Sequence, residues 1–362
     1  LKAAKDAADQ LMSMGAYSLT PNFKDLTTSI SLAGNPEVIV YREYEEGILM
    51  HSLMSFQNTE AEGSSPSRSL VESYLSANGL PIHQAENTMY KGDKWFFDEF
   101  ADLDPRLYDN IDKEGLRLEG TVAVYAATGY FAHLFVNPDL KTVPGGMSST
   151  NITDAPVMKL NEVMMNYIEA AAELADMGQY TLTQGDFDKT INALRNRPST
   201  SMPAVTLAGS NLAVNGVTIN DPDRDKGQMK SGDYEVSPIL WEVRRERRTE
   251  LPYQGIRFND LRRWGKLHYA DMKVNPKLNL GAWLDKDAYV AWYNEQNGTS
   301  LTVEDLKGIH LDREGNAGYI VPAIDASLLR TCEDKHYLYP IPSQEIALYQ
   351  SNGYTLSQNP GW

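Results

Sequence analysis

Seven arginines stand close together in the stretch WEVRRERRTELPYQGIRFNDLRRWGK, which runs from Trp241 to Lys266. Guanidinium groups gathered in this way do one of two kinds of chemistry. They bind phosphate, as in a nucleic-acid groove, or they pair with carboxylates in a buried scaffold. The formal net charge of the chain is −16, and an acidic surface repels phosphate everywhere except at a local basic patch. A general nucleic-acid binder is therefore disfavoured.

The spacing of the charges within this stretch favours the buried scaffold. A helix across 239–251 would place three glutamates in one row and two arginines in another, each at intervals of four residues. The rows are Glu242, Glu246 and Glu250, and Arg244 and Arg248. Like charges at this interval destabilise an isolated helix by about 0.2–0.5 kcal/mol per pair, so each row must meet opposite charge on another element. A phosphate-binding patch stays the alternative. The predicted partners are Glu162, Glu169, Glu173 and Asp260.

Catalytic and metal-binding patterns are weak in this chain. A glycosidase needs two carboxylates about 5–10 Å apart, and no spacing marks such a pair among the 49 acidic residues. The chain has no G-x-S-x-G elbow of a serine hydrolase, and its six histidines lack metal-binding spacing. Asp221, Asp223 and Asp225 resemble the start of a calcium loop, but Lys226 and Gly232 stand where an EF-hand has Gly and Glu. We expect no enzyme, no metal and no cofactor.

A mostly helical chain must position these residues. Periodicity predicts helices over 3–14, 157–178, 187–195, 237–251 and 256–264, and shorter ones over 286–295, 303–307 and 343–349. Brief β-branched runs predict strands or extended segments at 36–43 and 120–127. Stretches rich in Gly, Pro, Ser, Asn and Asp lie at 57–69, 84–118, 137–156, 198–235 and 268–282. The pattern predicts a helical frame that carries large loops.

Length and composition are those of a globular protein. The chain has 362 residues, of which 42% are apolar and 23% charged, enough for one large domain or two ordinary ones. No apolar run approaches the roughly 20 residues that span a bilayer, and a single cysteine allows no intrachain disulfide. The sequence begins LKAAKDAADQLMSMG, an amphipathic helix without an initiator Met. We therefore expect a longer precursor, of which this is the C-terminal part.

Several motifs, in the same order along the chain, resemble those of one family. The stretch RRERRTELPYQGIRFNDLRRWGK is similar to an E-R-R-x-E-L element followed by an E-G-x-R-x-x-D-L-R-R-W element. Five earlier segments agree in order, namely EVIVYREY, PSRSLVESYLSANGLPI, LDPRLYDNI, KLNEVMMNYIEAAAEL and INALRNRPS. The ending YLYPIPSQEIALYQSNGYTLSQNPGW is similar as well. On these motifs the chain resembles the SusD-like (SusD/RagB) family over essentially its whole length.

The resemblance implies a mostly α fold, in which a tetratricopeptide-like helical frame carries long irregular loops. It implies one SusD-like domain over 1–362, with the end of the repeat region at 1–35, a loop-rich ligand-binding region at 36–156, and the helical frame with the C-terminal signature at 157–362. Family members are lipoproteins on the outer-membrane surface that bind glycans and deliver them to a TonB-dependent transporter. They are not enzymes, and their lipid anchor would lie outside this sequence. The alternatives are a structural or peptide-binding subunit of the same complex and, less favoured, a glycoside hydrolase.

Glycan binding requires aromatic rings for the C–H faces of sugars and planar polar groups for their hydroxyls. Residues 87–110 read as a loop, yet they carry Tyr90, Trp95 and Phe96, with Asp98 interleaved among further aromatics. Either two of these rings anchor the loop in the core, or Trp95 forms a stacking platform with Tyr90 or Phe96.

A second aromatic segment, residues 279–300, offers two more tryptophans. A core-facing helix explains Tyr289 and Trp292 without any ligand, whereas Trp283 precedes that helix and is freer to bind. The sequence therefore yields one set of candidate ligand-binding residues, with no catalytic and no metal-binding ones. The set is Tyr90, Trp95, Phe96, Asp98, Trp283 and Trp292.

Overall fold

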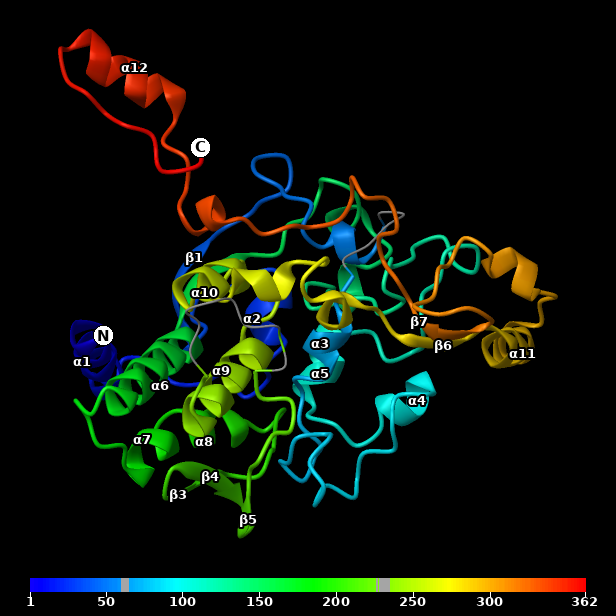
Figure 1. Cartoon of the computed structure of the whole chain (residues 1–362), viewed down its shortest axis with the longest axis horizontal. Helices are drawn as coiled ribbons and strands as arrows, with labels where there is room; N and C mark the ends of the chain where they lie inside the picture. Colours follow the sequence, from blue (N-terminus) through cyan, green and yellow to red (C-terminus); the bar gives the residue numbers. More distant parts are fainter. Residues whose placement is uncertain (60–64, 226, 228–234) are drawn as a thin grey trace.

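The computed structural model describes residues 1–59, 65–225, 227 and 235–362 (Figure 1). The α-helices among them are α1 (Lys2–Ser13), α2 (Asp25–Thr28), α3 (Arg68–Val71), α4 (Phe96–Glu99), α5 (Arg106–Asn110), α6 (Leu160–Asp176), α7 (Gln184–Asp188), α8 (Ile191–Arg195), α9 (Pro238–Glu250), α10 (Arg257–Arg263), α11 (Lys286–Asn297) and α12 (Ser343–Ser351). The strands are β1 (Val38–Arg42), β2 (Ala155–Lys159), β3 (Thr206–Ala208), β4 (Asn211–Val214), β5 (Val217–Thr218), β6 (Trp283–Asp285) and β7 (Ala317–Tyr319). The mostly helical class predicted from the sequence is confirmed.

Small antiparallel sheets connect segments that lie far apart in the sequence. β1 pairs with β2, and β6 pairs with β7 so that Trp283 lies opposite Tyr319. β3, β4 and β5 form a three-stranded sheet with a tight turn at Asn215 and Gly216, both of which have positive φ. The β1–β2 pair lies directly before α6 and fixes where that helix begins.

The principal core forms around α6, which packs between α1 and α9 (Figure 1). Met165, Ile168 and Ala171 on α6 are fully buried, as is Val243 on α9. The start of α9 follows from its sequence, because Ser237 accepts a hydrogen bond from the Leu240 amide and Pro238 occupies the first turn. This packing fixes the charged rows of α9 against neighbouring elements.

A second core lies beneath α3, α4, α5, β6 and α11, toward the right-hand side of Figure 1. Its buried residues include Tyr74, Leu107, Tyr130 and Leu284. This core brings residues 87–110 together with residues 279–300, the two aromatic segments of the sequence.

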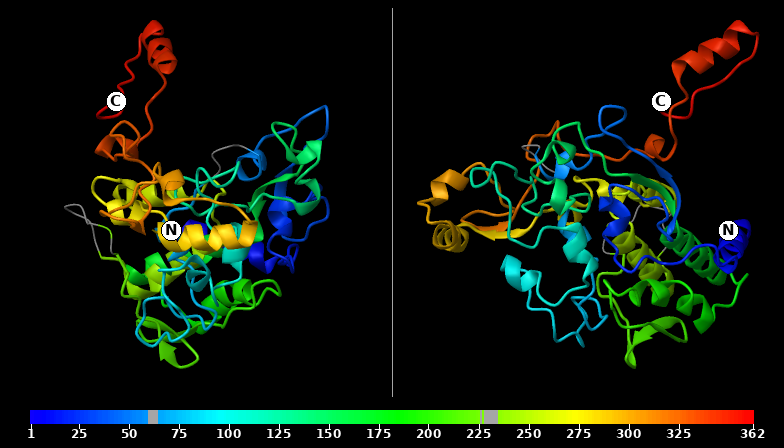
Figure 2. Two further views of the ribbon diagram at one scale, coloured as in Figure 1. Left: turned by 90° about the vertical axis from the view of Figure 1, so that its right-hand side faces the viewer. Right: turned by 180° about the vertical axis from the view of Figure 1, so that it is seen from behind.

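The C-terminal residues form an arm that carries α12 and projects from the body in both views of Figure 2. Its apolar side chains are exposed, with Leu348 at 55% and Tyr354 at 68%. Within the part of the chain that the structure describes, none of the helices combines the length and the apolar character needed to cross a membrane.

Four expectations about local structure are wrong. Residues 120–127 form no strand beyond an isolated bridge at Tyr125. The segment 187–195 is split between α7 and α8, because Thr190 has a non-helical backbone conformation (φ −127°, ψ −95°) between them. Val157 lies in β2 with 62% of its surface exposed, so it is not part of the buried α6 stripe. The loop predicted at 198–235 contains β3, β4 and β5.

Candidate functional site

The buried ion-pair scaffold is confirmed for four of the seven arginines in the stretch 241–266. Each of the four meets a carboxylate on α6, on α10 or on α9 itself. The pairs are Arg244–Glu173 at 2.6 Å, Arg245–Glu242 at 3.0 Å, Arg247–Asp260 at 2.7 Å and Arg263–Glu169 at 2.5 Å. Glu169, Glu173 and Asp260 are thus correct partners, whereas Glu162 makes no ion pair among the described residues.

The glutamates of α9 meet three further arginines, which come from α5 and from the end of α8. All of these side chains are at most 2% exposed. Each guanidinium reaches its partner at hydrogen-bond distance, which offsets the cost of removing the charges from water. The pairs are Arg106–Glu246 and Arg106–Glu250 at 2.8 Å, Arg195–Glu246 at 2.8 Å, Arg197–Glu250 at 3.0 Å and Arg197–Glu37 at 2.9 Å.

This network shifts the titration of Glu246 strongly. Burial alone would raise the pKa of its carboxyl, but the charges of Arg106 and Arg195 outweigh burial and lower the pKa to about 2. The residues involved come from the segments EVIVYREY, LDPRLYDNI, INALRNRPS and the arginine stretch. The paired residues of these motifs therefore hold the frame together and are not available for a ligand.

The aromatic residues of the two candidate segments meet at one surface, which we call the aromatic cluster (Trp95, Phe97, Trp283 and Trp292). The ring centroids of Trp95 and Trp292 are 6.0 Å apart, and those of Phe97 and Trp292 are 5.3 Å apart. The three tryptophans are half-buried and Phe97 is exposed. The shallow recess among these rings encloses only about 10 Å³, so the cluster is an open platform and not a pocket.

Backbone geometry decides which of these rings face outward. Trp95 precedes α4 in extended conformation, and within α4 one turn of helix places Phe96 and Phe100 on the inner side. Both phenylalanines are 5% exposed, and their rings stack at 4.3 Å. On β6, side chains alternate, so Leu284 points into the core while its neighbour Trp283 points out.

A polar chain runs along one edge of the aromatic cluster. The ammonium of Lys94 lies 3.7 Å from the Trp283 ring centroid and donates to the Tyr319 hydroxyl at 2.7 Å. Tyr319 donates to Asp93, which also pairs with Arg68 at 3.0 Å. Burial would raise the pKa of Asp93, but the Tyr319 hydrogen bond and the Arg68 charge lower it. Ionised groups therefore lie beside stacking rings, an arrangement suited to hydroxyl-rich ligands.

Only some of the six predicted ligand residues lie on the surface of the aromatic cluster. Trp95, Trp283 and Trp292 belong to the aromatic cluster, and Asp98 is exposed on α4 nearby. Phe96 borders the recess but is a core residue. Tyr90 is half-buried against His83, and its hydroxyl has no hydrogen-bond partner among the described residues. The helix expected at 286–295 buries Tyr289 at 3% exposure, as a core-facing helix should.

A buried carboxyl lies directly beneath this surface. Glu99, on α4, is 2% exposed and accepts hydrogen bonds from the Tyr130 hydroxyl at 2.7 and 2.8 Å. Burial, reinforced by the charges of Asp93 and Glu72, raises its pKa to about 8. The Glu99 carboxyl is thus held without a cationic partner close enough to keep it ionised.

The three aspartates that resemble a calcium loop have protein partners. Asp221 accepts from Arg245 and Trp241, Asp223 contacts His83, and Asp225 accepts from Tyr269 at 2.7 Å. Lys226 and Gly232, the other positions of that comparison, lie outside the described residues. Within the described residues, no group of His, Cys, Asp or Glu side chains is arranged to hold a metal ion.

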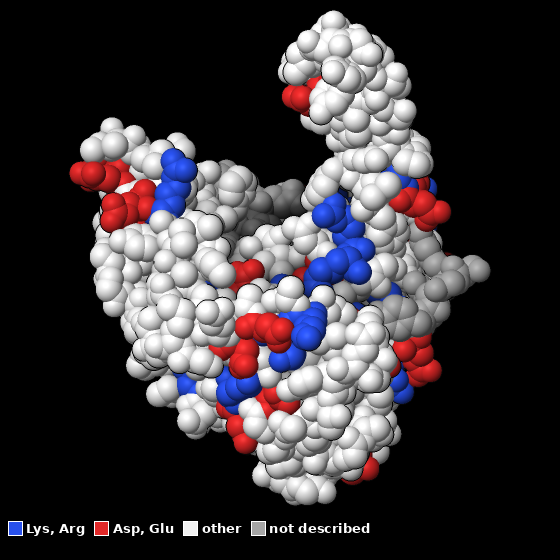
Figure 3. Space-filling model, turned by 90° about the vertical axis from the view of Figure 1, so that its left-hand side faces the viewer, with Lys and Arg blue, Asp and Glu red and all other residues white. Residues whose placement is uncertain are grey.

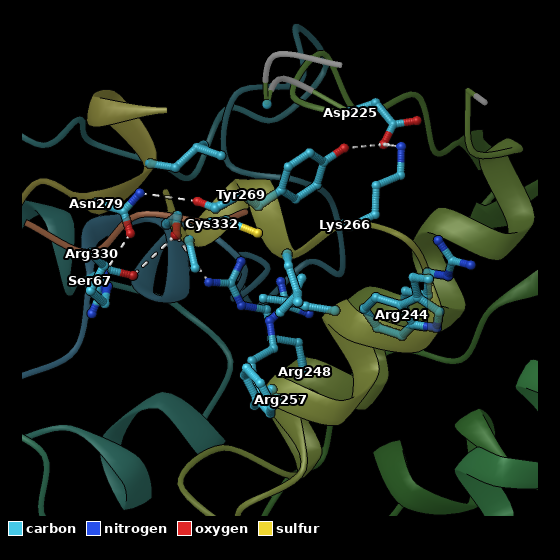
Figure 4. Close-up of a pocket in the computed structure, with 18 of the residues that line it drawn as sticks. Ser67, Asp225, Arg244, Arg248, Arg257, Lys266, Tyr269, Asn279, Arg330 and Cys332 are labelled. Atoms are coloured by element: carbon cyan, nitrogen blue, oxygen red, sulfur yellow. Dashed lines mark hydrogen bonds and ion pairs between the residues drawn. The ribbon is translucent and has the colours of Figure 1, made fainter. Parts of the chain in front are cut away.

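Sequence reasoning missed a large cavity, which measures about 700 Å³ and lies between the arginine stretch and the C-terminal segment (Figure 4). Arg248 and Arg257, which form no ion pair within the described part of the chain, line it together with Arg330. The signal in the sequence was the row of like charge formed by Arg244 and Arg248, of which the structure pairs Arg244 with Glu173.

Comparison with known proteins places these features in a family. The profile of the SusD family matches residues 51–362. A SusD-like carbohydrate-binding protein from Bacteroides fragilis is similar in structure, with a TM-score of 0.62 and 23% identity, over 95% of this chain and 60% of that one. A second SusD-like protein from Bacteroides fragilis gives a TM-score of 0.56 and 19% identity, over 99% of this chain and 61% of that one.

The chain thus spans about 60% of the length of these two solved structures. No curated protein sequence matches it. The family profile covers well over half of the chain and includes the aromatic cluster, the cavity and almost all of the ion-pair network. The chain belongs to the SusD family.

Proposed function

We propose that this protein binds a glycan at the cell surface and delivers it to a TonB-dependent transporter of the outer membrane. The observation that carries the proposal is the aromatic cluster, in which tryptophans nearly two hundred residues apart share one open platform. Sugar rings stack their C–H faces on such rings, while their hydroxyls bond to nearby charged and amide groups. The structurally similar protein from Bacteroides fragilis described as carbohydrate-binding supports this assignment.

The surroundings of Trp283 refine where a sugar would bind. Lys94 covers one side of this ring, and its side chain is 59% exposed, so a ligand could displace it at little cost in packing. Trp95 and Trp292 meet edge to face, which leaves ring surface open beside Phe97. We place the first sugar on Trp95 and Trp292 and a second near Trp283, with Asp98 and Lys94 as hydrogen-bonding groups.

Affinity electrophoresis against plant, host and microbial polysaccharides tests the proposal. The parent is run beside Trp95→Ala and Trp283→Ala, with Tyr354→Ala on the C-terminal arm as an aromatic control. We expect one glycan class to retard the parent and the control, and the two tryptophan variants to lose most of that retardation. Stacking of one ring contributes about 1–1.5 kcal/mol, or roughly a tenfold change in affinity. Far-ultraviolet circular dichroism confirms that each variant is folded.

The opposite results are equally informative. If a glycan retards all four proteins equally, the ligand binds elsewhere and the aromatic platform is not the site. If no glycan retards the parent, the glycan proposal fails, and a peptide library then tests the alternative of a peptide-binding subunit. Turnover of a retained glycan would point to a hydrolase.

The proposed transporter partner has its own test. A tagged form of the protein, expressed in a bacterium that carries the corresponding TonB-dependent β-barrel, should co-purify with that barrel from outer membranes. Co-purification without any glycan binding would favour a structural subunit. Absence of the barrel from the purified material would contradict the delivery step while leaving glycan binding intact.

A further inference from the structure

The cavity beneath the C-terminal arm is rich in basic residues. Its volume of about 700 Å³ is large enough for several sugar rings. Figure 3 shows Lys and Arg side chains gathered at the base of the arm, although the protein as a whole is acidic. Arginines from α9, α10 and the C-terminal segment line the cavity, and Figure 4 labels Arg244, Arg248, Arg257 and Arg330 among them.

The carboxylates that line this cavity are committed to other partners. Glu72 pairs with Arg68 at 2.6 Å, and Asp221 contacts Arg245. Asp223 contacts His83, and Asp225 accepts from Tyr269 and lies 4.0 Å from Lys266. The acidic groups are therefore balanced by cations other than Arg248, Arg257 and Arg330.

Three arginines remain without a carboxylate among the residues that the structure describes. Arg248 donates to the Ser69 hydroxyl at 3.0 Å, and Arg330 donates to the Asn279 side chain at 2.7 Å. Arg257 only lies over the Trp264 ring, at 5.5 Å from its centroid. A neutral oxygen accepts one of the hydrogen bonds that a guanidinium can donate, but it does not neutralise the positive charge.

Repulsion between Arg248 and Arg257 also indicates positive charge in the cavity that the carboxylates of the described residues do not compensate fully. Burial and the charge of Arg257 lower the pKa of Arg248. Burial, opposed by Asp260 and reinforced by Arg244, lowers the pKa of Arg257 to about 10. With a pKa of about 10, Arg257 still carries its proton at neutral pH, so positive charge lies where water is partly excluded. An anion placed between them would relieve this repulsion.

The other walls of the cavity suit a carbohydrate better than a bare ion. Phe258 and Tyr339, both exposed, line the cavity with ring centroids 6.3 Å apart and ring planes tilted by 52°, and the Arg262 guanidinium lies over the Tyr339 ring. Polar side chains of Ser67, Tyr269 and Asn279 also line the cavity. A nucleic acid fits poorly, because the acidic surface repels a polyanion whereas a single acidic group entering the cavity meets only the local positive charge.

We propose that this cavity binds an acidic sugar, whose carboxylate or sulfate is held by Arg248 and Arg257 while its ring packs against Phe258 and Tyr339. Arg330, on the C-terminal segment, completes the anion site from the opposite wall. This inference rests on the proposed glycan binding and adds the chemical class of the ligand. It also assigns a second binding surface, separate from the aromatic cluster.

Isothermal titration calorimetry with trigalacturonate and with the neutral galactotriose tests the inference. We expect the parent to bind the acidic trisaccharide about tenfold or more tightly than the neutral one, with the preference shrinking as salt is raised. Arg257→Met and Arg248→Met should each lose this preference, and Arg257→Lys should keep part of it. Arg42→Met is the matched control, since it removes one exposed arginine remote from the lining residues and should behave like the parent.

The possible results distinguish a failure of the acidic-sugar site from a failure of the proposed glycan binding. Equal affinity for both trisaccharides, unchanged in Arg257→Met, would overturn the acidic-sugar site and leave the proposed glycan binding standing. Binding of neither trisaccharide, together with a thermal shift by inorganic sulfate that Arg257→Met abolishes, would show a site for small anions and overturn the assignment to a sugar. No response to trigalacturonate or to sulfate, in a parent that binds a neutral polysaccharide, would also overturn it.

Discussion

Two faces of α9 carry the same residue type in opposite electrostatic settings. On the face toward α6 and α10, Arg247 meets the Asp260 carboxylate at 2.7 Å. On the face toward the cavity, Arg248 has the Ser69 hydroxyl as its hydrogen-bond acceptor and no carboxylate within ion-pair distance among the described residues. A buried charge that is paired holds elements together, while a charge left without a counterion is stabilised by whatever anion arrives. The contrast separates the frame of this protein from a place where it can bind.

The frame should respond most strongly to the loss of a single carboxylate. Glu250 is fully buried and lies between Arg106 and Arg197, at 2.8 and 3.0 Å. Glu250→Gln keeps the shape but removes the charge, and leaves two buried guanidiniums undercompensated. We expect the free energy of unfolding to fall by about 3–5 kcal/mol, measured by urea denaturation. The matched control is Glu304→Gln, whose exposed ion pair with Lys307 should contribute less than about 1 kcal/mol.

If Glu250→Gln lowers the free energy of unfolding by no more than the control does, the buried network contributes little to stability. The comparison between the two faces of α9 would then be wrong. A variant too unstable to purify is consistent with the expected loss. In that case Glu37→Gln, which removes only one partner of Arg197, gives the measurable intermediate.

The carboxyl beneath the aromatic cluster should show the opposite pH dependence from the frame. The pKa of Glu99 is raised by burial from an ordinary 4.5 to about 8. Below the ordinary pKa both states are protonated and the stability is complete. As the pH rises from there to the folded-state pKa, the unfolded state releases its proton first and stability falls. Glu99→Gln removes this loss and should raise stability at about pH 7 by about 3 kcal/mol.

The measurement is urea denaturation of the parent and of Glu99→Gln at several pH values between those two pKa values. The two curves should converge at the acidic end. A constant difference across the whole range would mean that Glu99 is ionised in the folded protein and that its pKa is not raised.

Acid should weaken the frame through Glu246. Burial opposes ionisation, but Arg106 and Arg195 lower the pKa of this carboxyl from 4.5 to about 2. Its stabilising effect is therefore complete above the ordinary pKa and is lost as the pH falls toward the folded-state pKa. At about pH 3 the loss should reach about 2 kcal/mol. The slope of stability against pH in this acid range should be smaller in Glu246→Gln than in the parent, and an unchanged slope would contradict the assigned pairing.

Much of the frame was predictable from the sequence because its signals are local and periodic. The charged rows of α9 and the apolar stripe of α6 each specify a helix and the chemistry of its partner. The error at 120–127 has the opposite cause, because a β-branched run forms a strand only when a partner strand lies beside it. The strands of 198–235 were missed because they are very short and bounded by many turn residues.

The candidate sites were predictable only in part, since they depend on contacts between distant segments. The sequence alone named Trp95, Trp283 and Trp292 as candidates. Only the fold brings their two segments, 87–110 and 279–300, to one surface. Phe96 could not be told from its neighbour Phe97, because the direction of each ring depends on where α4 begins. The cavity was not foreseen, since Arg330 joins Arg248 from a segment with no pattern of its own.

The smallest expected effect is also the sharpest test of the comparison between the two faces. Arg257→Met removes a cation that has no carboxylate partner among the described residues and keeps an apolar stem over Trp264. Stability should stay within about 1 kcal/mol of the parent, or rise, because repulsion with Arg248 disappears. Arg197→Met makes the same chemical change in the frame and should cost about 3–5 kcal/mol, since Glu37 and Glu250 lose a partner. Added sulfate should raise the melting temperature of the parent but not that of Arg257→Met. If both substitutions lower the free energy of unfolding by the same amount, Arg257 is part of the buried frame, and the proposal that the cavity binds an anion is wrong.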